Sequence, residues 1–210
     1  MHIPDGFLTV NTCVSTWLIS VASIGYCLKR IALKLEERMI PTIGVTSAFI
    51  FAAQMLNFPV IGGTSGHLMG GVLAAVLLGP YAGAIVISLV LIVQCLIFQD
   101  GGLTALGANI LNMAILGSSG GYLIYKLIKV ISKNMMVAVA LASWLSIVIA
   151  SLACAVELGI SGISPFKIVI PAMVGIHALI GIGEAIISCL VIDFVLKVRP
   201  DLIYKGEREL

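Results

Sequence analysis

Two of the three histidines, His2 and His67, are the residues of this chain best placed to bind a metal ion. One ion could bind the α-amine of Met1, the amide nitrogen of His2 and its ring Nδ1 together. The His67 ring could add a fourth nitrogen, and a square of nitrogens suits Ni²⁺ and Cu²⁺. The amine and the amide must both lose a proton, so we expect binding to weaken as the pH falls. An equally simple interpretation is that His2 is a polar residue at a frayed terminus.

The surroundings of His67 favour an uncharged ring. His67 follows a Gly/Ser/Thr-rich stretch, residues 61–66, and is expected near the start of a short helix. A helix N-terminus disfavours a charged imidazolium, and the neutral imidazole is the form that binds metal ions. His67 could instead be a hydrogen-bonded residue between helices.

Polar residues in the loops could support such a site. Asp100 lies in an Asp-Gly-Gly loop, where it could orient a ligating histidine or simply form a turn. Asp5, after Pro4, is expected to cap the first helix. The remaining candidates for a supporting role are Thr64, Ser65 and Asn109.

Polar residues also occur inside long apolar runs. Glu184 lies near the middle of the last run, where a charge costs at least about 2.5–3.5 kcal/mol on insertion scales. His177 is seven residues earlier and therefore on the same helix face. The two could line a polar interior or pair with another helix. Four amides could form hydrogen bonds between helices or contact a substrate: Gln54, Gln94, Asn109 and Asn112.

Small residues recur at four-residue spacing, which allows helices to approach closely. They serve packing within the chain or form a docking face for another subunit. The residues concerned are Gly71, Ala75, Gly79 and Gly83.

The composition places all these residues in a membrane protein. Of the 210 residues, 60% are hydrophobic and 10% are charged, against about 45–50% and about 25% in soluble domains. So few charges cannot cover a soluble surface, and soluble enzymes, nucleic-acid binders and disordered chains fit poorly. We therefore expect an all-α, polytopic membrane helix bundle, with residues 1–210 forming a single integral membrane domain.

The apolar runs predict seven transmembrane segments, since each crossing needs about 20 mostly apolar residues. The third segment is short. The expected bounds are 7–28, 41–58, 67–78, 81–98, 104–127, 135–156 and 171–197.

The basic residues predict the orientation of these segments. All but Lys167 follow the first, fifth or seventh segment, and basic loops stay in the cytoplasm. The N-terminus is then outside and the C-terminus cytoplasmic. No basic residue precedes the first segment and no small-residue cleavage site follows it, so we expect Met1 to begin the mature protein. The grouped basic residues are Lys29, Arg30, Lys34, Arg38, Lys126, Lys129, Lys133, Lys197, Arg199, Lys205 and Arg208.

The sequence contains no G-x-x-x-x-G-K-[ST] nucleotide loop and no set of nucleophile, base and orienting group. We therefore expect neither an enzyme nor a chain with its own ATPase. Active transport would draw on an ion gradient or on a partner.

Motifs along nearly the whole chain carry a family likeness. They are MHIPDGFL at 1–8, GTSGHLMGG at 63–71, LGPYAG at 78–83, QDGGLTALGAN at 99–109, NM at 112–113 and HALIGIGE at 177–184. Together they resemble the substrate-capture (S) subunits of energy-coupling-factor transporters for nickel and cobalt, the NikM/CbiM type. The Met-His start and the block around His67 are the most specific parts.

The resemblance implies a seven-helix bundle in the cell membrane of a prokaryote. It implies that Ni²⁺ or Co²⁺, the transported substrate, binds the Met1 amine, the His2 amide and ring, and His67. It also implies a complex with a membrane coupling subunit, two ATPase subunits and often a small accessory membrane protein. In this family the capture subunit topples in the membrane, driven by ATP hydrolysis in its partners, and itself binds no nucleotide. Cobalt relatives often begin Met-His-Ile-Met-Glu-Gly after a cleaved leader, so Pro4 and Asp5 favour nickel here.

Two further functions compete with this interpretation. One is a stand-alone, ion-coupled permease for divalent metals that uses Glu184 and His177. The other is a membrane scaffold whose polar residues only pack.

Overall fold

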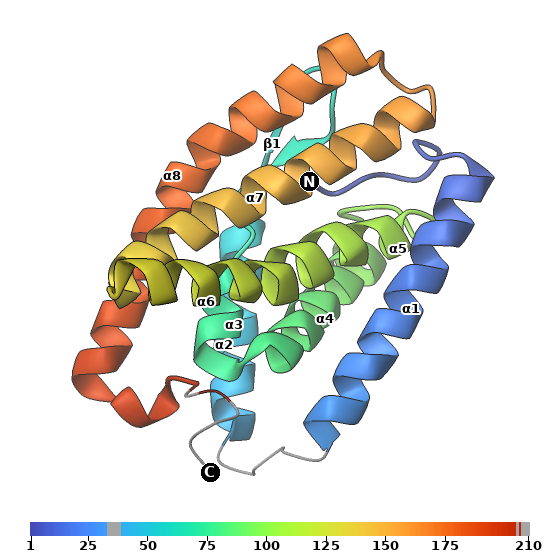
Figure 1. Cartoon of the computed structure of the whole chain (residues 1–210). Coiled ribbons are helices and arrows are strands. Elements are labelled where there is room, and N and C mark those ends of the chain that lie inside the picture. The colour runs from blue at the N-terminus through green and yellow to red at the C-terminus, as the bar shows by residue number, and fades with distance from the viewer. Residues whose placement is uncertain (33–38, 205, 207–210) are drawn as a thin grey trace.

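The chain is built almost entirely from helices (Figure 1). The computed structural model describes residues 1–32, 39–204 and 206. The elements are α1 (Val10–Ala32), α2 (Met39–Gln54), β1 (Phe58–Pro59), β2 (Ser65–Gly66), α3 (Gly71–Leu78), α4 (Pro80–Phe98), α5 (Leu106–Asn109), the π-helix η1 (Ile110–Gly120), α6 (Gly121–Ser132), α7 (Met135–Ile160), α8 (Phe166–Val198) and the short 3₁₀ turn η2 (Pro200–Leu202).

Five helical stretches of the described chain are long and apolar enough to cross a membrane. This confirms the expected helical, membrane-spanning character. The 16-residue α2 is a shorter apolar helix, and α3 has only eight residues. The five stretches are Val10–Ala32, Pro80–Phe98, Leu106–Ser132, Met135–Ile160 and Phe166–Val198.

The segment between α2 and α3 is longer than the sequence indicated. The second helix ends at Gln54, and a two-stranded antiparallel hairpin follows, in which Phe58 pairs with Gly66. The third helix begins at Gly71 because Gly70 adopts a left-handed conformation, with φ of 74°. His67 therefore lies in an irregular segment before the helix, and its expected place at a helix start is wrong.

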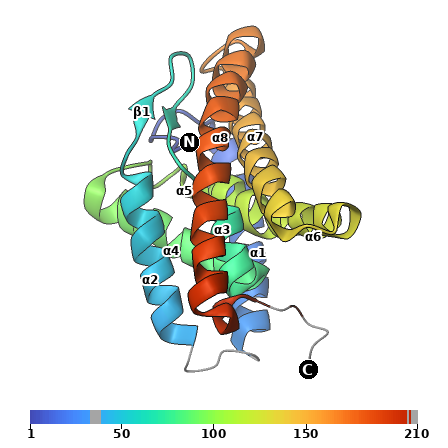
Figure 2. The ribbon, with the colours of Figure 1, turned by 90° about the vertical axis from the view of Figure 1, so that its left-hand side faces the viewer.

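The short helix α3 lies at the centre of the bundle, and all eight of its residues are buried. Figure 2 shows it between α2 on one side and α6 and α7 on the other. A Cβ at Gly71 would collide with the backbone of Gly117 in η1, and one at Gly83 would collide with Ser118 and Ala75.

The ladder of small residues is therefore a packing device inside this chain. A Cβ at Gly79 would meet the Tyr204 ring, and Gly71, Ala75, Gly79 and Gly83 are all buried. The burial of all four residues supports packing within the chain, and the docking face stays an untested prediction.

Gly71→Ala should destabilise the protein by about 1–3 kcal/mol, the usual cost of overpacking a filled interior. The matched control is Gly175→Ala in α8, where an added Cβ has open space and helix propensity gains up to about 1 kcal/mol. Thermal unfolding in detergent measures both. Equal melting temperatures for the two variants would contradict this packing.

Candidate metal-binding site

The N-terminal segment runs into the interior of the bundle, where Met1 is 0% and His2 is 4% exposed (Figure 1). The side-chain amide of Asn109 in α5 holds this segment by pairing with both the N–H and the C=O of Ile3, as the backbone of a neighbouring strand would. The Ile3 amide donates to Asn109 Oδ1 at 2.9 Å, and Asn109 Nδ2 donates to the Ile3 carbonyl at 3.2 Å. The Gly102 amide donates to the same carbonyl at 2.8 Å. These bonds fix the backbone next to His2.

Asp5 anchors the other end of this segment. Its carboxylate accepts hydrogen bonds from the Thr104 hydroxyl at 2.6 Å, the Thr104 amide at 2.7 Å and the Leu103 amide at 3.2 Å. The bonds from Thr104 hold the pKa of Asp5 below its usual value. The sequence predicted that Asp5 caps the first helix. That prediction is wrong, because the helix begins at Val10.

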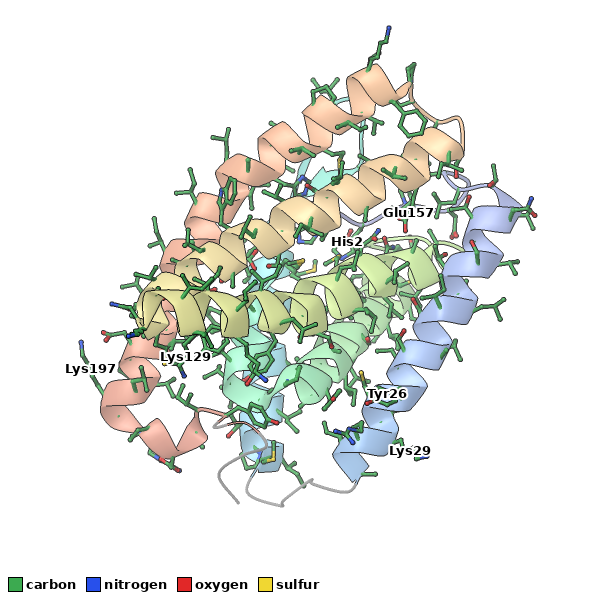
Figure 3. All side chains as sticks on the ribbon, in the orientation of Figure 1. His2, Tyr26, Lys29, Lys129, Glu157 and Lys197 are labelled. Carbon is green, nitrogen blue, oxygen red and sulfur yellow. The ribbon has the colours of Figure 1, made fainter. Side chains whose placement is uncertain are left out.

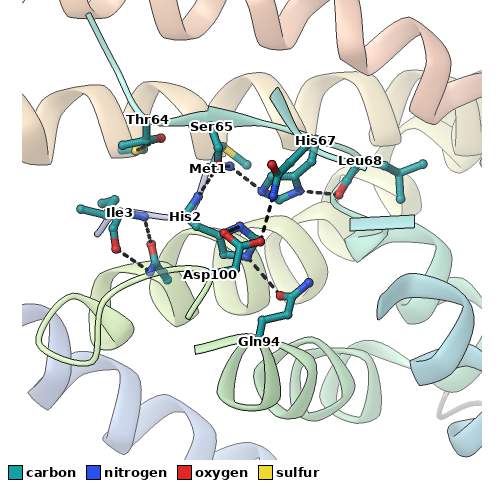
Figure 4. Close-up of polar contacts among 12 residues, drawn as sticks. Met1, His2, Ile3, Thr64, Ser65, His67, Leu68, Gln94 and Asp100 are labelled. Carbon is teal, nitrogen blue, oxygen red and sulfur yellow. Dashed lines mark hydrogen bonds and ion pairs between the residues drawn. The ribbon is translucent and has the colours of Figure 1, made fainter. Parts of the chain in front are cut away.

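The α-amine of Met1 meets His67 at the buried end of the segment (Figure 4). The amine nitrogen lies 2.5 Å from His67 Nε2. His67 Nδ1 donates to the Leu68 carbonyl at 2.7 Å, so Nε2 carries the lone pair that faces the amine. Ser65 Oγ accepts from the amine at 3.1 Å and from the His2 amide at 3.0 Å. The expected supporting role of Ser65 therefore has a geometric basis.

The His2 ring stacks on the His67 ring, with centroids 4.4 Å apart and planes 17° apart. His2 Nε2 lies 3.1 Å from Gln94 Oε1, an acceptor, so both this nitrogen and Nδ1 face oxygen atoms. Asp100 Oδ1 is 3.2 Å from that Nδ1. Asn57 Nδ2 donates to Asp100 Oδ2 at 2.9 Å. Asp100 thus lies beside the ring nitrogen that the sequence nominated as a ligand.

Burial favours the lone-pair form of each of these nitrogens. It lowers the pKa of the Met1 amine from 8.0 to about 5. It also lowers the pKa of His2, and it lowers the pKa of His67 well below its usual value. Burial acts to raise the pKa of Asp100, but the His2 ring, the Met1 amine and Asn57 together hold that pKa below its usual value. The site therefore presents neutral nitrogens next to one carboxylate.

The other nominated residues border this site. Thr64 Oγ1 lies 3.9 Å from each of the sulfur atoms of Cys154 and Met173. His177 Nδ1 donates to the Met173 carbonyl at 2.7 Å. Glu184 accepts from backbone amides just before α3, not from His177.

The partners of Gln94 and Gln54 could not be named from the sequence. Both were expected to link helices or to contact a substrate. Gln94 contacts His2, and Gln54 Nε2 donates to the Met69 carbonyl at 2.8 Å. The signal in the sequence was an amide within an apolar run. Such an amide needs a hydrogen-bond partner, but the sequence does not show which residue that partner is.

Side chains alone do not form a metal site here. Within the part of the chain that the structure describes, no three His, Cys, Asp or Glu residues are grouped so that they could hold an ion. A site at His2 and His67 must therefore use main-chain nitrogens, and the Met1 amine and the His2 amide are the ones present.

Comparison with known proteins points to the same function class. The family model CbiM, described as "cobalt uptake substrate-specific transmembrane region", matches residues 2–202. A putative fused nickel transport protein NikMN of Archaeoglobus fulgidus is 42% identical, over 97% of this chain and 68% of that protein. A putative cobalt transport protein CbiM 2 of Methanosphaerula palustris is 32% identical, over 98% of this chain and 91% of that protein.

A solved structure agrees with the fold. The crystal structure of a truncated transition metal transporter superposes with a TM-score of 0.91 at 35% identity, covering 94% of this chain and 99% of the other. With five apolar helices long enough to span a bilayer, the chain is a multi-pass protein of the cell membrane. It belongs to the CbiM family of substrate-specific transmembrane proteins.

Proposed function

We propose that this chain captures Ni²⁺, and less favourably Co²⁺, as the substrate-binding subunit of an importer. The observation that carries the proposal is the buried Met1 amine, 2.5 Å from His67 Nε2 and joined to the stacked His2 ring. The ion would bind the Met1 amine, the His2 amide nitrogen, His2 Nδ1 and His67 Nε2. Relatives named as nickel or cobalt transport proteins support the choice of cargo.

The donor set favours nickel. A square of nitrogens suits Ni²⁺ better than Co²⁺, whereas oxygen ligands suit Mg²⁺ and Ca²⁺. Charge also balances in this buried place. The deprotonated His2 amide and the Asp100 carboxylate, 3.2 Å from His2 Nδ1, together offset the two positive charges of the ion, which a low-dielectric interior requires.

We further propose seven membrane segments, with the N-terminus outside and the C-terminus in the cytoplasm. The helical stretches support this if α2 and α3 each count as one segment and α5, η1 and α6 form another. In Figure 3, Lys29, Lys129 and Lys197 lie nearer the lower end of the molecule than His2 and Glu157 do. Four further basic residues lie outside the described part: Lys34, Arg38, Lys205 and Arg208.

Energy would come from partners. The sequence has no nucleotide-binding loop, so we propose a complex with a membrane coupling subunit, two ATPase subunits and a small accessory membrane protein. The stand-alone permease gains no support. Glu184 is engaged by two backbone amides, and His177 by the Met173 carbonyl, so the two do not form a proton relay with each other.

Metal analysis of the purified protein tests the capture step. We expect about one Ni²⁺ per chain, with the absorption of a planar nitrogen site. Excess Mg²⁺ should not displace it. Absence of tight binding, or an octahedral oxygen-rich spectrum, would overturn the proposed site.

Uptake assays test the energy source. Cells that make this chain with its partners should accumulate nickel, and inactivating the partner ATPases should stop accumulation. Uptake by this chain alone, dependent on a proton or sodium gradient and on Glu184, would instead establish the permease.

A further inference from the structure

The carboxylate of Glu184 lies against the backbone that follows His67, although Glu184 is on α8, far along the chain. It is 1% exposed. Oε2 accepts from the Met69 amide at 2.7 Å and Oε1 accepts from the Gly70 amide at 3.0 Å. On the other side, Gln54 of α2 donates to the Met69 carbonyl at 2.8 Å. The backbone of Met69 is therefore held from both sides.

One peptide group joins Glu184 to His67. The amide that Glu184 binds belongs to the peptide bond between Leu68 and Met69, and the carbonyl of that same bond accepts from His67 Nδ1 at 2.7 Å. A peptide group is planar, so fixing the direction of its N–H also fixes the direction of its C=O. That carbonyl in turn sets the plane and the tautomer of the His67 ring.

We propose that Glu184 is a positioning residue for His67 that acts through the Leu68–Met69 peptide group. The carboxylate orients this peptide and polarises it, because hydrogen bonds in a chain strengthen one another. A more negative Leu68 carbonyl draws harder on the Nδ1 proton and makes Nε2 a better electron donor to the ion. Carboxylates that bind ligating histidines directly act in the same sense. The inference rests on the proposed role of His67 as a ligand.

The bonding pattern requires a carboxylate at this position. Two successive amide N–H groups converge on Glu184, so two acceptor oxygens are needed. A glutamine offers one oxygen and one NH₂ group, and the NH₂ group would face an N–H donor. A buried charge in a membrane helix is costly and usually has a function, and charge-assisted bonds offset part of the cost.

Glu184→Gln should lower the affinity for Ni²⁺ about 10–100-fold, the usual effect of losing the partner of a ligating histidine. The matched control is Glu157→Gln in α7. Glu157 is also a buried carboxylate, but among the described residues its side chain accepts one bond, from Asn112 Nδ2 at 2.6 Å, which the oxygen of a glutamine can keep. The control should bind nickel as the unaltered protein does. Unchanged affinity in Glu184→Gln would overturn the inference.

A double-mutant cycle separates positioning from general damage to the fold. If Glu184 acts through His67, Glu184→Gln should cause no further loss of affinity in a His67→Ala background. The absorption spectrum of the nickel-bound Glu184→Gln single variant should also move toward that of His67→Ala. An equal loss in both backgrounds would mean a structural role and refute the inference. Failure of the unaltered protein to bind nickel, or unchanged binding by His67→Ala, would refute the proposed site itself.

A backbone substitution tests the same bond without altering Glu184. Replacing Met69 by its α-hydroxy analogue converts the amide N–H into an ester oxygen. Nickel affinity should fall in the same direction as in Glu184→Gln. Unaltered affinity in the ester would contradict the inference even if Glu184→Gln does not fold.

Discussion

Two residues added ahead of Met1 will abolish tight nickel binding. The α-amine becomes a peptide nitrogen that lacks the basic lone pair, and the new amine lies about 7 Å away along the chain. Met1 is fully buried, with its amine between Ser65 Oγ and His67 Nε2, so the added residues have no room. We expect a loss of more than about 100-fold, beyond that for an outer partner of a metal ligand. A titration against a competing chelator measures it.

A removable extension gives this experiment its control. A site-specific protease that cuts directly before Met1 should restore full affinity to the same protein sample. A retained formyl group on Met1 should also prevent binding, without adding a residue. If the extended protein bound nickel as tightly as the cleaved protein, the amine would not be a ligand.

His67→Ala will weaken nickel binding at least about 10-fold and change its spectrum. The Met1 amine and the two His2 nitrogens remain as a three-nitrogen hook, but water must replace His67 Nε2, and its weaker field moves the absorption of planar Ni²⁺. Isothermal titration and visible absorption spectra measure the two effects.

The control for this variant is His177→Asn. His177 is a buried histidine beside the site, with its ring near the Ser65 backbone. It donates from Nδ1 to the Met173 carbonyl, and the Asn amide can make a similar bond. Nickel affinity should stay near that of the unaltered protein. Equal losses of nickel affinity in His67→Ala and His177→Asn would show that removing any buried histidine harms the protein. His67 would then no longer be supported as a ligand.

The sequence was a good guide to what depends on local composition. Apolar runs located the long helices, and the scarcity of polar residues brought Met1, His2 and His67 forward as the candidate ligands. The structure places these three together, as a metal site requires. Their binding of an ion stays a prediction.

Local patterns could not show contacts between distant parts of the chain. Asp5 has the residue type and spacing of a helix cap, but it bonds to Thr104, 99 residues away. Glu184 bonds to Met69 across 115 residues. Because Gly70 adopts a left-handed conformation, α3 begins only at Gly71. The φ angle of a glycine cannot be predicted from its residue type alone. Likewise, a run of apolar residues does not reveal the π-helix η1.

The buried position of the N-terminal segment has a consequence for the rates at which metal ions bind and leave. Residues 1–5 contain three of the four proposed ligand nitrogens and also cover the site, held by Asn109, Gly102 and Thr104. Because Met1 and His2 are buried, we expect an ion to reach these nitrogens when the segment opens, and the rate of opening should then be common to all divalent ions. Discrimination between nickel and other ions must then reside in how long each one stays bound.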